Sequence, residues 1–166
     1  MNIPRFLELY REGRTEDAFL SIILDNPLAA STGRVCQHPC DTRCRRQSFD
    51  EVVNMREVHR HIADATYATD HFEPAVARLL TRKLAPTGKK VSVAGAGPTG
   101  LTAAFYLAML GQDVTVFEER AMKGQLGSPR SHPAGPLRLT ALASVLSFQK
   151  SVKNEAEVSG DLRGNP

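Results

Sequence analysis

The segment Gly95-Ala-Gly-Pro-Thr-Gly100 constrains the fold of this chain more than any other feature, because apolar segments of different periodicity flank it. Val91 and Val93 alternate with polar residues, as in a short strand. Residues 101–110 have the composition of an apolar helix, and residues 114–117 predict a second strand. A strand, a glycine loop, a helix and a strand in this order predict a βαβ unit.

The three glycines of this loop have separate roles in a dinucleotide site. Gly95 permits a tight turn, Gly97 lets a pyrophosphate approach the backbone, and Gly100 lets the helix pack against the strand. Glu118, at the end of the second predicted strand, is placed to accept hydrogen bonds from a ribose hydroxyl. Glu119 takes that place if the strand ends one residue later. An isolated glycine loop is often only a surface turn, but the flanking elements favour dinucleotide binding.

All three cysteines, Cys36, Cys40 and Cys44, lie in one short segment. Such an odd, closely spaced set is a poor disulfide framework and indicates reduced thiols that bind a soft metal. The C-x3-C-x3-C spacing matches neither the closer pairs of a zinc finger nor the common ferredoxin run. Three small buried core thiols are the structural alternative.

A tetrahedral metal or a four-iron cluster needs a fourth ligand, and four side chains are candidates. His38 and Asp41 lie between the cysteines, where reaching back to the same site would strain the chain. His59 and His61 lie on the next predicted helix, and His59 could face the thiolates. The alternative for each histidine is an ordinary amphipathic residue whose ring reaches solvent.

Capping signals predict helices from the N-terminus to about residue 70. Asn2 caps a helix over residues 4–13, a second begins at Thr15 and ends at Asn26-Pro27, and Asn54 caps a helix that runs to about Thr69. Pro39 predicts a short helix that places Cys40 and Cys44 on one face, with Cys36 in the loop before it. In the helix after Asn54, the predicted buried stripe is Met55, Val58, Ile62 and Ala65, flanked by His59 and His61.

The predicted fold class is α+β, with a helical metal-binding domain followed by a partial Rossmann-type unit. We expect the helical domain at residues 1–72 and a connector with one short helix, around Val76 to Leu80, at residues 73–88. The βαβ unit is expected at residues 89–126, and a loop-rich, partly disordered tail with a helix near Thr140 to Lys150 at residues 127–166.

Composition excludes several functions. Basic and acidic residues number 21 and 18, a net charge of +3 without long single-sign blocks, so no nucleic-acid surface is predicted. The longest apolar stretch is about half of a membrane span, and the charged N-terminus is unlike a signal peptide. We therefore expect a cytoplasmic protein without membrane insertion.

Three runs, in their order along the chain, resemble the glutamate synthase small-subunit family and the N-terminal half of dihydropyrimidine dehydrogenase. They are Asn26 to Cys44, Val53 to Asp64 and Lys89 to Ala104, and the resemblance covers about residues 2–126. It implies a helical domain with 4Fe-4S clusters beside an FAD domain. A further domain that binds NAD(P)H in such proteins is absent from this chain.

The resemblance also implies residue roles. Cys36, Cys40 and Cys44 match cluster ligands, and the residues that match FAD contacts are Gly95, Gly97, Gly100 and Glu118. His59 falls where relatives use glutamine or glutamate as a ligand that is not cysteine. Thr32 stands where many relatives have a fourth cysteine and others have threonine.

Two departures from the family pattern bear on completeness. The cysteine-rich stretch that relatives carry before the segment matching Asn2 to Phe6 is missing, so a second cluster lacks its ligands. After Lys123-Gly-Gln-Leu126 the flavin domain does not continue, and two strands alone leave a doubly wound sheet incomplete. We expect a fragment, a frame-shifted product or a subunit completed by another oxidoreductase chain, not catalytically complete alone.

These patterns predict an electron-transfer module of an NAD(P)H-dependent oxidoreductase, which passes electrons between FAD and a 4Fe-4S cluster. No acid-base or nucleophilic constellation for a substrate is present, so no catalytic residue is assigned. One alternative is a non-catalytic helical interaction domain with zinc or a structural cluster and a degenerate nucleotide loop. Another is an enzyme that binds a nicotinamide, without flavin, at the glycine loop.

Overall fold

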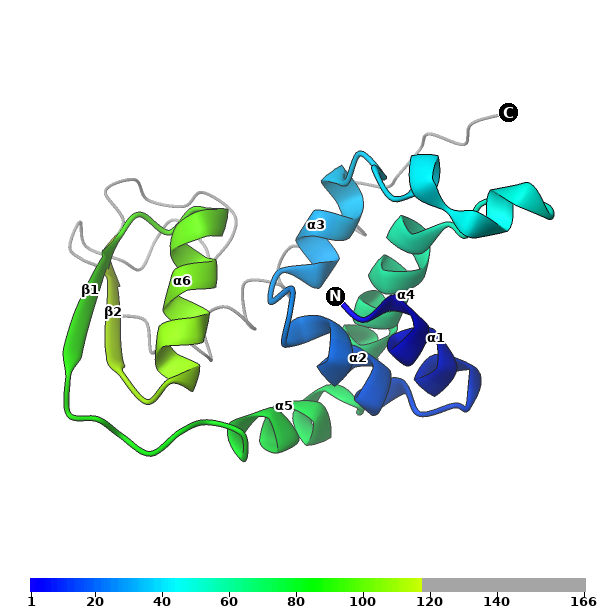
Figure 1. The fold of residues 1–166 in the computed structure, drawn as a ribbon. Coiled ribbons are helices and arrows are strands. Elements are labelled where there is room, and N and C mark those ends of the chain that lie inside the picture. The colour runs from blue at the N-terminus through cyan, green and yellow to red at the C-terminus, as the bar shows by residue number, and fades with distance from the viewer. Residues whose placement is uncertain (118–166) are drawn as a thin grey trace, which may run out of the picture. The chain divides into compact units, whose positions relative to one another are not determined.

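A computed structural model of the chain describes residues 1–117 (Figure 1). The chain divides into two compact units, of which the first is Met1–Ala75 and the second begins at Val76. The first unit is helical, and the second contains a βαβ unit. The predicted α+β class is therefore confirmed. The helix predicted near Thr140 to Lys150 and the predicted tail lie outside the described residues.

Two short helices open the first unit, and both were predicted from their ends. Helix α1 spans Ile3–Arg11, and the Asn2 side chain accepts a hydrogen bond from the Arg5 N–H at 3.1 Å. Gly13 follows with φ +75°, in the left-handed region that glycine adopts without strain. Helix α2 spans Thr15–Ile23 and buries its apolar face, including Phe19, against the rest of the unit.

Helix α3, Ala29–Val35, was not predicted from the sequence. No side chain caps its first turn, and it contains Gly33 together with the β-branched Thr32. The turn before it is closed by the Asn26 amide, which donates to the Thr32 hydroxyl at 2.8 Å. Ala29 and Ala30 are fully buried, so tertiary packing stabilises a helix that its local sequence does not favour.

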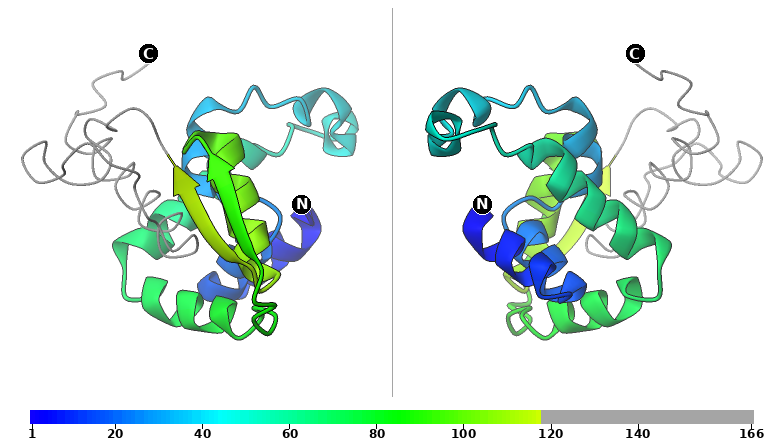
Figure 2. Two further views of the ribbon diagram at one scale, coloured as in Figure 1. Left: turned by 90° about the vertical axis from the view of Figure 1, so that its left-hand side faces the viewer. Right: turned by 90° about the vertical axis from the view of Figure 1, so that its right-hand side faces the viewer.

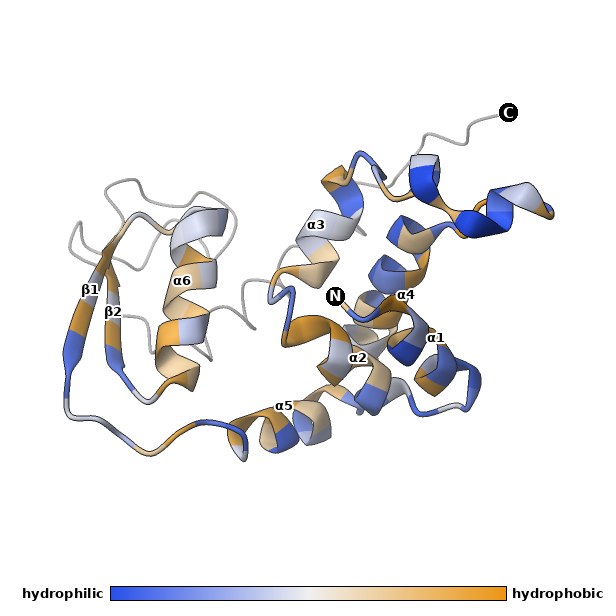
Figure 3. Cartoon of the chain, viewed as in Figure 1, coloured by the Kyte–Doolittle hydropathy of each residue, from blue (hydrophilic) through white to orange (hydrophobic). Residues whose placement is uncertain are grey.

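The prediction of a short helix that begins at Pro39 is wrong. The structure has two 3-10 turns here, η1 at Asp41–Arg43 and η2 at Arg45–Ser48, with Cys44 extended between them. No residue from 34 to 54 is buried, so no core contact supports an α-helix. We call residues 36–54 the cysteine arm. Figure 3 shows the arm, cyan in Figure 1, as largely hydrophilic.

Helix α4, Met55–Ala68, begins at the predicted cap, where the Asn54 side chain accepts from the Glu57 N–H at 3.3 Å. Its buried stripe differs from the prediction. His59 lies inside the stripe instead of beside it, whereas Val58 and Ala65 are half-buried. The buried residues of α4 are Met55, His59, Ile62, Ala63, Thr66 and Tyr67.

Helix α5, Phe72–Leu80, precedes an irregular connector, and starts earlier than the predicted short helix around Val76 to Leu80. The connector is hydrogen-bonded to the end of helix α6, Pro98–Met109, through the Leu84 N–H and the Met109 carbonyl at 2.8 Å. A Cβ at Gly111, which has φ +81°, would overlap the Ala85 carbonyl. Gly111 therefore serves both the left-handed turn and this close approach.

The predicted βαβ unit is confirmed. Strands β1, Lys90–Ala94, and β2, Asp113–Phe117, pair in parallel with Val91 opposite Val114 and Val93 opposite Val116. Helix α6 contacts both strands, and the left view of Figure 2 shows it against one face of the pair. In the described part of the chain, no helix is long and apolar enough to cross a membrane.

Candidate metal centre and nucleotide-binding loop

The three cysteines occupy three different positions around the cysteine arm. Cys36 ends α3, where its N–H bonds to the Thr32 carbonyl at 2.9 Å. Cys40 precedes turn η1 and is exposed, and Cys44 follows that turn and is half-buried. All three are free thiols. Reduced thiols are the form that binds iron or zinc.

The surroundings of Cys40 and Cys44 shift their thiol pKa values in opposite directions. Desolvation, followed by the negative charge of Asp41, raises the pKa of Cys40. Backbone N–H groups, first that of Val53 and then that of Arg46, lower the pKa of Cys44. The backbone around Cys44 therefore favours its thiolate form, whereas the surroundings of Cys40 disfavour the thiolate form of that residue.

His59 presents a nitrogen atom suited to a metal. Its Nδ1 lies 2.9 Å from the Met55 carbonyl, which can only accept, so Nδ1 carries the proton and Nε2 has a free lone pair. The Nε2 atom of His59 is buried, and no described residue forms a hydrogen bond with it. Desolvation lowers the pKa of His59, which keeps the ring neutral. A neutral imidazole is the ligand form of histidine.

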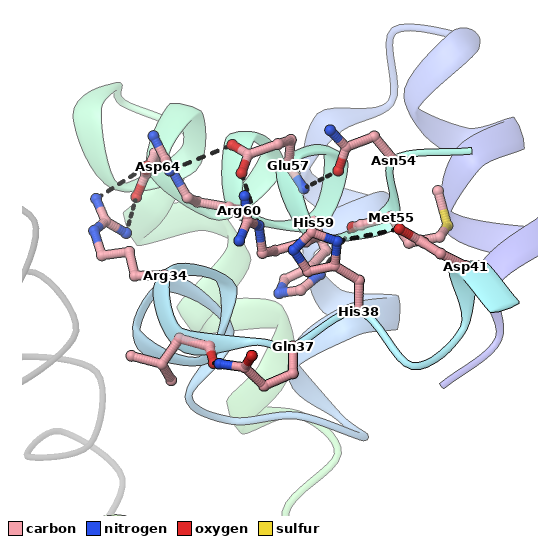
Figure 4. A network of polar contacts seen from close by, with 12 residues as sticks. Arg34, Gln37, His38, Asp41, Asn54, Met55, Glu57, His59, Arg60 and Asp64 are labelled. Atoms are coloured by element: carbon pink, nitrogen blue, oxygen red, sulfur yellow. Dashed lines mark hydrogen bonds and ion pairs between the residues drawn. The ribbon is translucent and has the colours of Figure 1, made fainter. Parts of the chain in front are cut away.

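The unpartnered nitrogen of His59 faces helix α3, which ends at Cys36. A Cβ placed on Gly33 would come within 3.1 Å of the His59 Nε2 and 2.7 Å of the Arg60 Cβ. Figure 4 shows the His59 ring between α4 and α3. Cys36 lies about one helical turn beyond Gly33. The His59 nitrogen thus lies beside Gly33, about one helical turn before Cys36.

The other candidate ligands, His38, Asp41 and His61, and also Thr32, form hydrogen bonds or ion pairs within the chain. His38 has φ +45° and pairs through Nδ1 with the Asp41 carboxylate at 3.1 Å. His61 is exposed and bonds through Nε2 to the Tyr10 hydroxyl at 2.8 Å. The Thr32 hydroxyl donates to the Leu28 carbonyl at 2.9 Å, so this side chain has a structural role in α3.

The donor set of three thiols and one buried imidazole nitrogen fits an iron-sulfur cluster or zinc. Among residues 1–117, no three His, Cys, Asp or Glu side chains are gathered around a point that would hold a single metal ion. A four-iron cluster takes one side chain per iron, so its ligands are spaced more widely. The unpartnered Nε2 is the observation that favours a bound group.

The glycine loop has the geometry expected for phosphate binding. Gly95 has φ +91°, and Gly97 precedes the first turn of α6 and is exposed. A Cβ on Gly100 would overlap the Gly95 carbonyl, so helix and loop approach as closely as glycine allows. Nothing lies within 4 Å of a Cβ on Gly97, which leaves room for a ligand beside it. Glu118 and Glu119 lie outside the described residues.

Sequence reasoning missed three residues beside the candidate metal centre: Gly33, Arg34 and Asp64. Arg34 pairs with Asp64 through two bonds of 3.1 Å between α3 and α4. Their separation of 30 residues hides the pair in the sequence. A glycine within a helical segment was the one available signal, since it often marks a close approach.

Comparisons with known proteins agree with the two units. Residues 1–71 match the family described as dihydropyrimidine dehydrogenase domain II, 4Fe-4S cluster. Residues 93–147 match the NAD(P)-binding Rossmann-like domain family. The resemblance predicted from the sequence is thus confirmed, and the chain joins a region of the 4Fe-4S family to a Rossmann-like region.

The chain is similar to several oxidoreductase subunits. The NADPH-Fe(3+) oxidoreductase subunit beta of Geobacter sulfurreducens is 38% identical over 119 residues, which cover 71% of this chain and 17% of the relative. The NADP(+)-dependent formate dehydrogenase subunit beta of Moorella thermoacetica is 35% identical over 139 residues, or 75% and 20%. The glutamate synthase (NADPH) small chain of Bacillus subtilis is 33% identical over 124 residues, or 75% and 24%. The chain thus spans less than a quarter of the length of these relatives.

Proposed function

We propose that the chain is an electron-transfer module of an NAD(P)H-dependent iron-sulfur flavoprotein. Residues 1–72 hold a 4Fe-4S cluster through Cys36, Cys40, Cys44 and His59 in this proposal. The observation that carries it is the buried His59 Nε2, which lacks a partner among the described residues and faces the helix that ends at Cys36.

When bound, a 4Fe-4S cluster supplies one-electron transfer at a potential that its ligands and their hydrogen bonds set. The chain's own residues supply the binding. Backbone N–H groups around Cys44 favour its thiolate, and the Met55 carbonyl fixes the His59 tautomer with Nε2 unprotonated. Burial of His59 excludes water from that side of the site.

The proposed βαβ unit comprises residues 89–126 and follows a connector at residues 73–88. In this proposal the βαβ unit binds FAD. Gly97 and the N-terminus of α6 would receive the pyrophosphate, and Glu118 the ribose. The match to an NAD(P)-binding family favours a second candidate, in which this loop holds a nicotinamide nucleotide and no flavin. The nicotinamide domain and the physiological acceptor would lie on another part of the protein or on a partner subunit.

Anaerobic purification of the full chain, with measurement of bound iron, sulfide, zinc, flavin and nicotinamide, tests the proposal. We expect about four iron and four sulfide per chain and bound FAD. Zinc without iron would instead support a structural metal site. Nicotinamide without flavin would support the second candidate for the loop.

Two histidine variants test the fourth ligand. His59→Ala is expected to lower cluster occupancy and to leave flavin content unchanged. His61→Ala is the matched control, because His61 lies on the same helix, is exposed and is bonded to Tyr10. A full and spectroscopically unaltered cluster in His59→Ala would reject His59 as a ligand.

A further inference from the structure

Arg34 and Asp64 join the two helices that carry Cys36 and His59. The Arg34 Nη1 and Nη2 atoms donate to the two carboxylate oxygens of Asp64, each at 3.1 Å. Nη1 also donates to the Ala30 carbonyl at 2.7 Å, so the guanidinium is fixed on its own helix as well. Both side chains are 23% exposed, so solvent screens this pair less than a surface pair.

Helix α3 depends on α4 for its position. It has seven residues and no side-chain cap, and a helix of this length is not stable alone. Gly33 brings its backbone against Arg60, which sets how closely the helices approach. Close approach at a glycine does not fix sliding or rotation, because glycine has no side chain to interlock. A bidentate ion pair beside it does, because its two bonds require one geometry.

The pair lies next to the candidate ligands in the sequence. Arg34 is two residues before Cys36, which ends α3, and Asp64 is five residues after His59 on α4. Figure 4 shows Arg34 reaching Asp64 along the same helix interface that holds His59. Any shift of α3 along α4 therefore moves Cys36 relative to the His59 nitrogen.

We propose that Arg34 and Asp64 form a positioning pair that sets the separation of Cys36 from His59, so that one cluster is held by both. This inference rests on the proposed function, since it requires a cluster at these residues. Neither residue contacts the cluster. Their action is through the placement of helix α3.

Arginine is required at position 34 in this proposal. A lysine would keep the charge but has no planar fork, so it cannot hold both Asp64 oxygens and the Ala30 carbonyl in one geometry. Arg60 also approaches Asp64, at 3.6 Å, and Glu57 at 3.3 Å, but all three belong to α4. Arg60 therefore adds no link between the helices through its charge.

The test compares Arg34→Lys and Asp64→Asn with the control Arg60→Gln in the full chain. Each protein is purified anaerobically and reconstituted with iron and sulfide. Cluster release to an iron chelator is timed, and the nitrogen hyperfine coupling of the reduced cluster is recorded by pulsed electron paramagnetic resonance. Circular dichroism of the metal-free proteins checks the helical fold.

We expect both pair variants to release the cluster about tenfold faster or more, as for partners of metal ligands in general. Their histidine coupling is expected to weaken or split into several species, while Arg60→Gln behaves as the parent. Release and coupling equal to the parent in both pair variants would overturn the inference but leave the proposed function intact. Failure of the parent to take up a cluster would overturn both. Loss of helical signal in both metal-free variants would also overturn the inference, because the pair would then serve folding alone.

Discussion

His59 shows how the environment of one side chain decides its chemistry. The sequence placed it beside a buried stripe, whereas the structure places it within that stripe at 4% exposure. The Met55 carbonyl occupies one ring nitrogen, and the other has no partner within the described residues. A buried polar atom without a partner costs about 1–3 kcal/mol. The metal-ligand role proposed for His59 would offset that cost.

Acid is expected to destabilise the metal-free chain through His59. Burial lowers the pKa of His59 in the folded state, so the unfolded state takes up this proton first as the pH falls. The stability contributed by the neutral ring is fully present above about pH 6.5, the ordinary histidine pKa, and is lost as the pH falls toward the lower folded pKa. Thermal unfolding of the metal-free chain between about pH 7.5 and 5 measures this loss.

His59→Gln is the reference for this pH series, because glutamine fills similar space and does not titrate. The parent chain is expected to lose more stability than the variant on acidification, with the difference opening below about pH 6.5. Parallel stability curves for the two proteins would show that His59 does not titrate across this range.

At the scale of elements, the sequence predicted those helices and strands whose ends carry local signals. Asn2 and Asn54 cap α1 and α4 as expected, and the βαβ unit follows its glycine loop. Helix α3 was missed because its stability comes from packing against α4 and not from caps or propensity. The helix expected at Pro39 does not form because proline at a first helical position is not enough by itself. No residue of the cysteine arm is buried, so no core contact stabilises a helix there.

The candidate site divides in the same way. Residue types and spacing identified the cysteines and His59 as candidates, because only a few side-chain types bind iron or zinc and these can be recognised in a sequence. The contacts of Gly33 and the pair of Arg34 with Asp64 could not be predicted, because they arise from distant segments that meet only in the fold. The same holds for the Met55 carbonyl that selects the His59 tautomer.

Substitutions at Gly97 and Gly100, in the loop and first turn of helix α6, are predicted to have different effects on stability and on FAD affinity. Gly100→Ala places a methyl group against the Gly95 carbonyl, and we expect it to destabilise the second unit by about 1–3 kcal/mol. Gly97→Ala meets no atom within 4 Å and is expected to change stability by less than about 0.5 kcal/mol. The same methyl group would stand where a pyrophosphate approaches, so FAD affinity should fall by about tenfold or more.

Hydrogen exchange of the α6 amides and FAD titration of the full chain measure the two effects separately. Unchanged FAD affinity in a folded Gly97→Ala protein would argue against phosphate binding at this loop. Equal destabilisation by both substitutions would argue against the close helix packing at Gly100.

At the scale of the whole molecule, the two units present different surfaces. The first has a packed helical core, but its cysteine arm has no buried residue, and Phe49 on it is 89% exposed. In the second, α6 is apolar on most sides, and Leu110 and Phe117 are 51% and 41% exposed among the described residues. The relatives are four or more times longer than the matched region.

Limited trypsin digestion is expected to show that cluster binding orders the arm alone. Arg43 and Arg45 are exposed on the arm, where no core contact protects the backbone, and Arg82 and Lys83 are exposed in the connector. In the proposal, reconstitution with iron and sulfide links the three arm cysteines to His59 through the cluster. Cleavage after Arg43 and Arg45 should therefore slow by about tenfold or more. A tenfold change corresponds to a local opening that costs about 1.4 kcal/mol more. Cleavage in the connector is the internal control, because no proposed ligand lies there.

Mass spectrometry of the fragments assigns each cut. Equal protection of arm and connector would indicate general compaction, and no protection of either would show that the cysteines hold no cluster that restrains the arm.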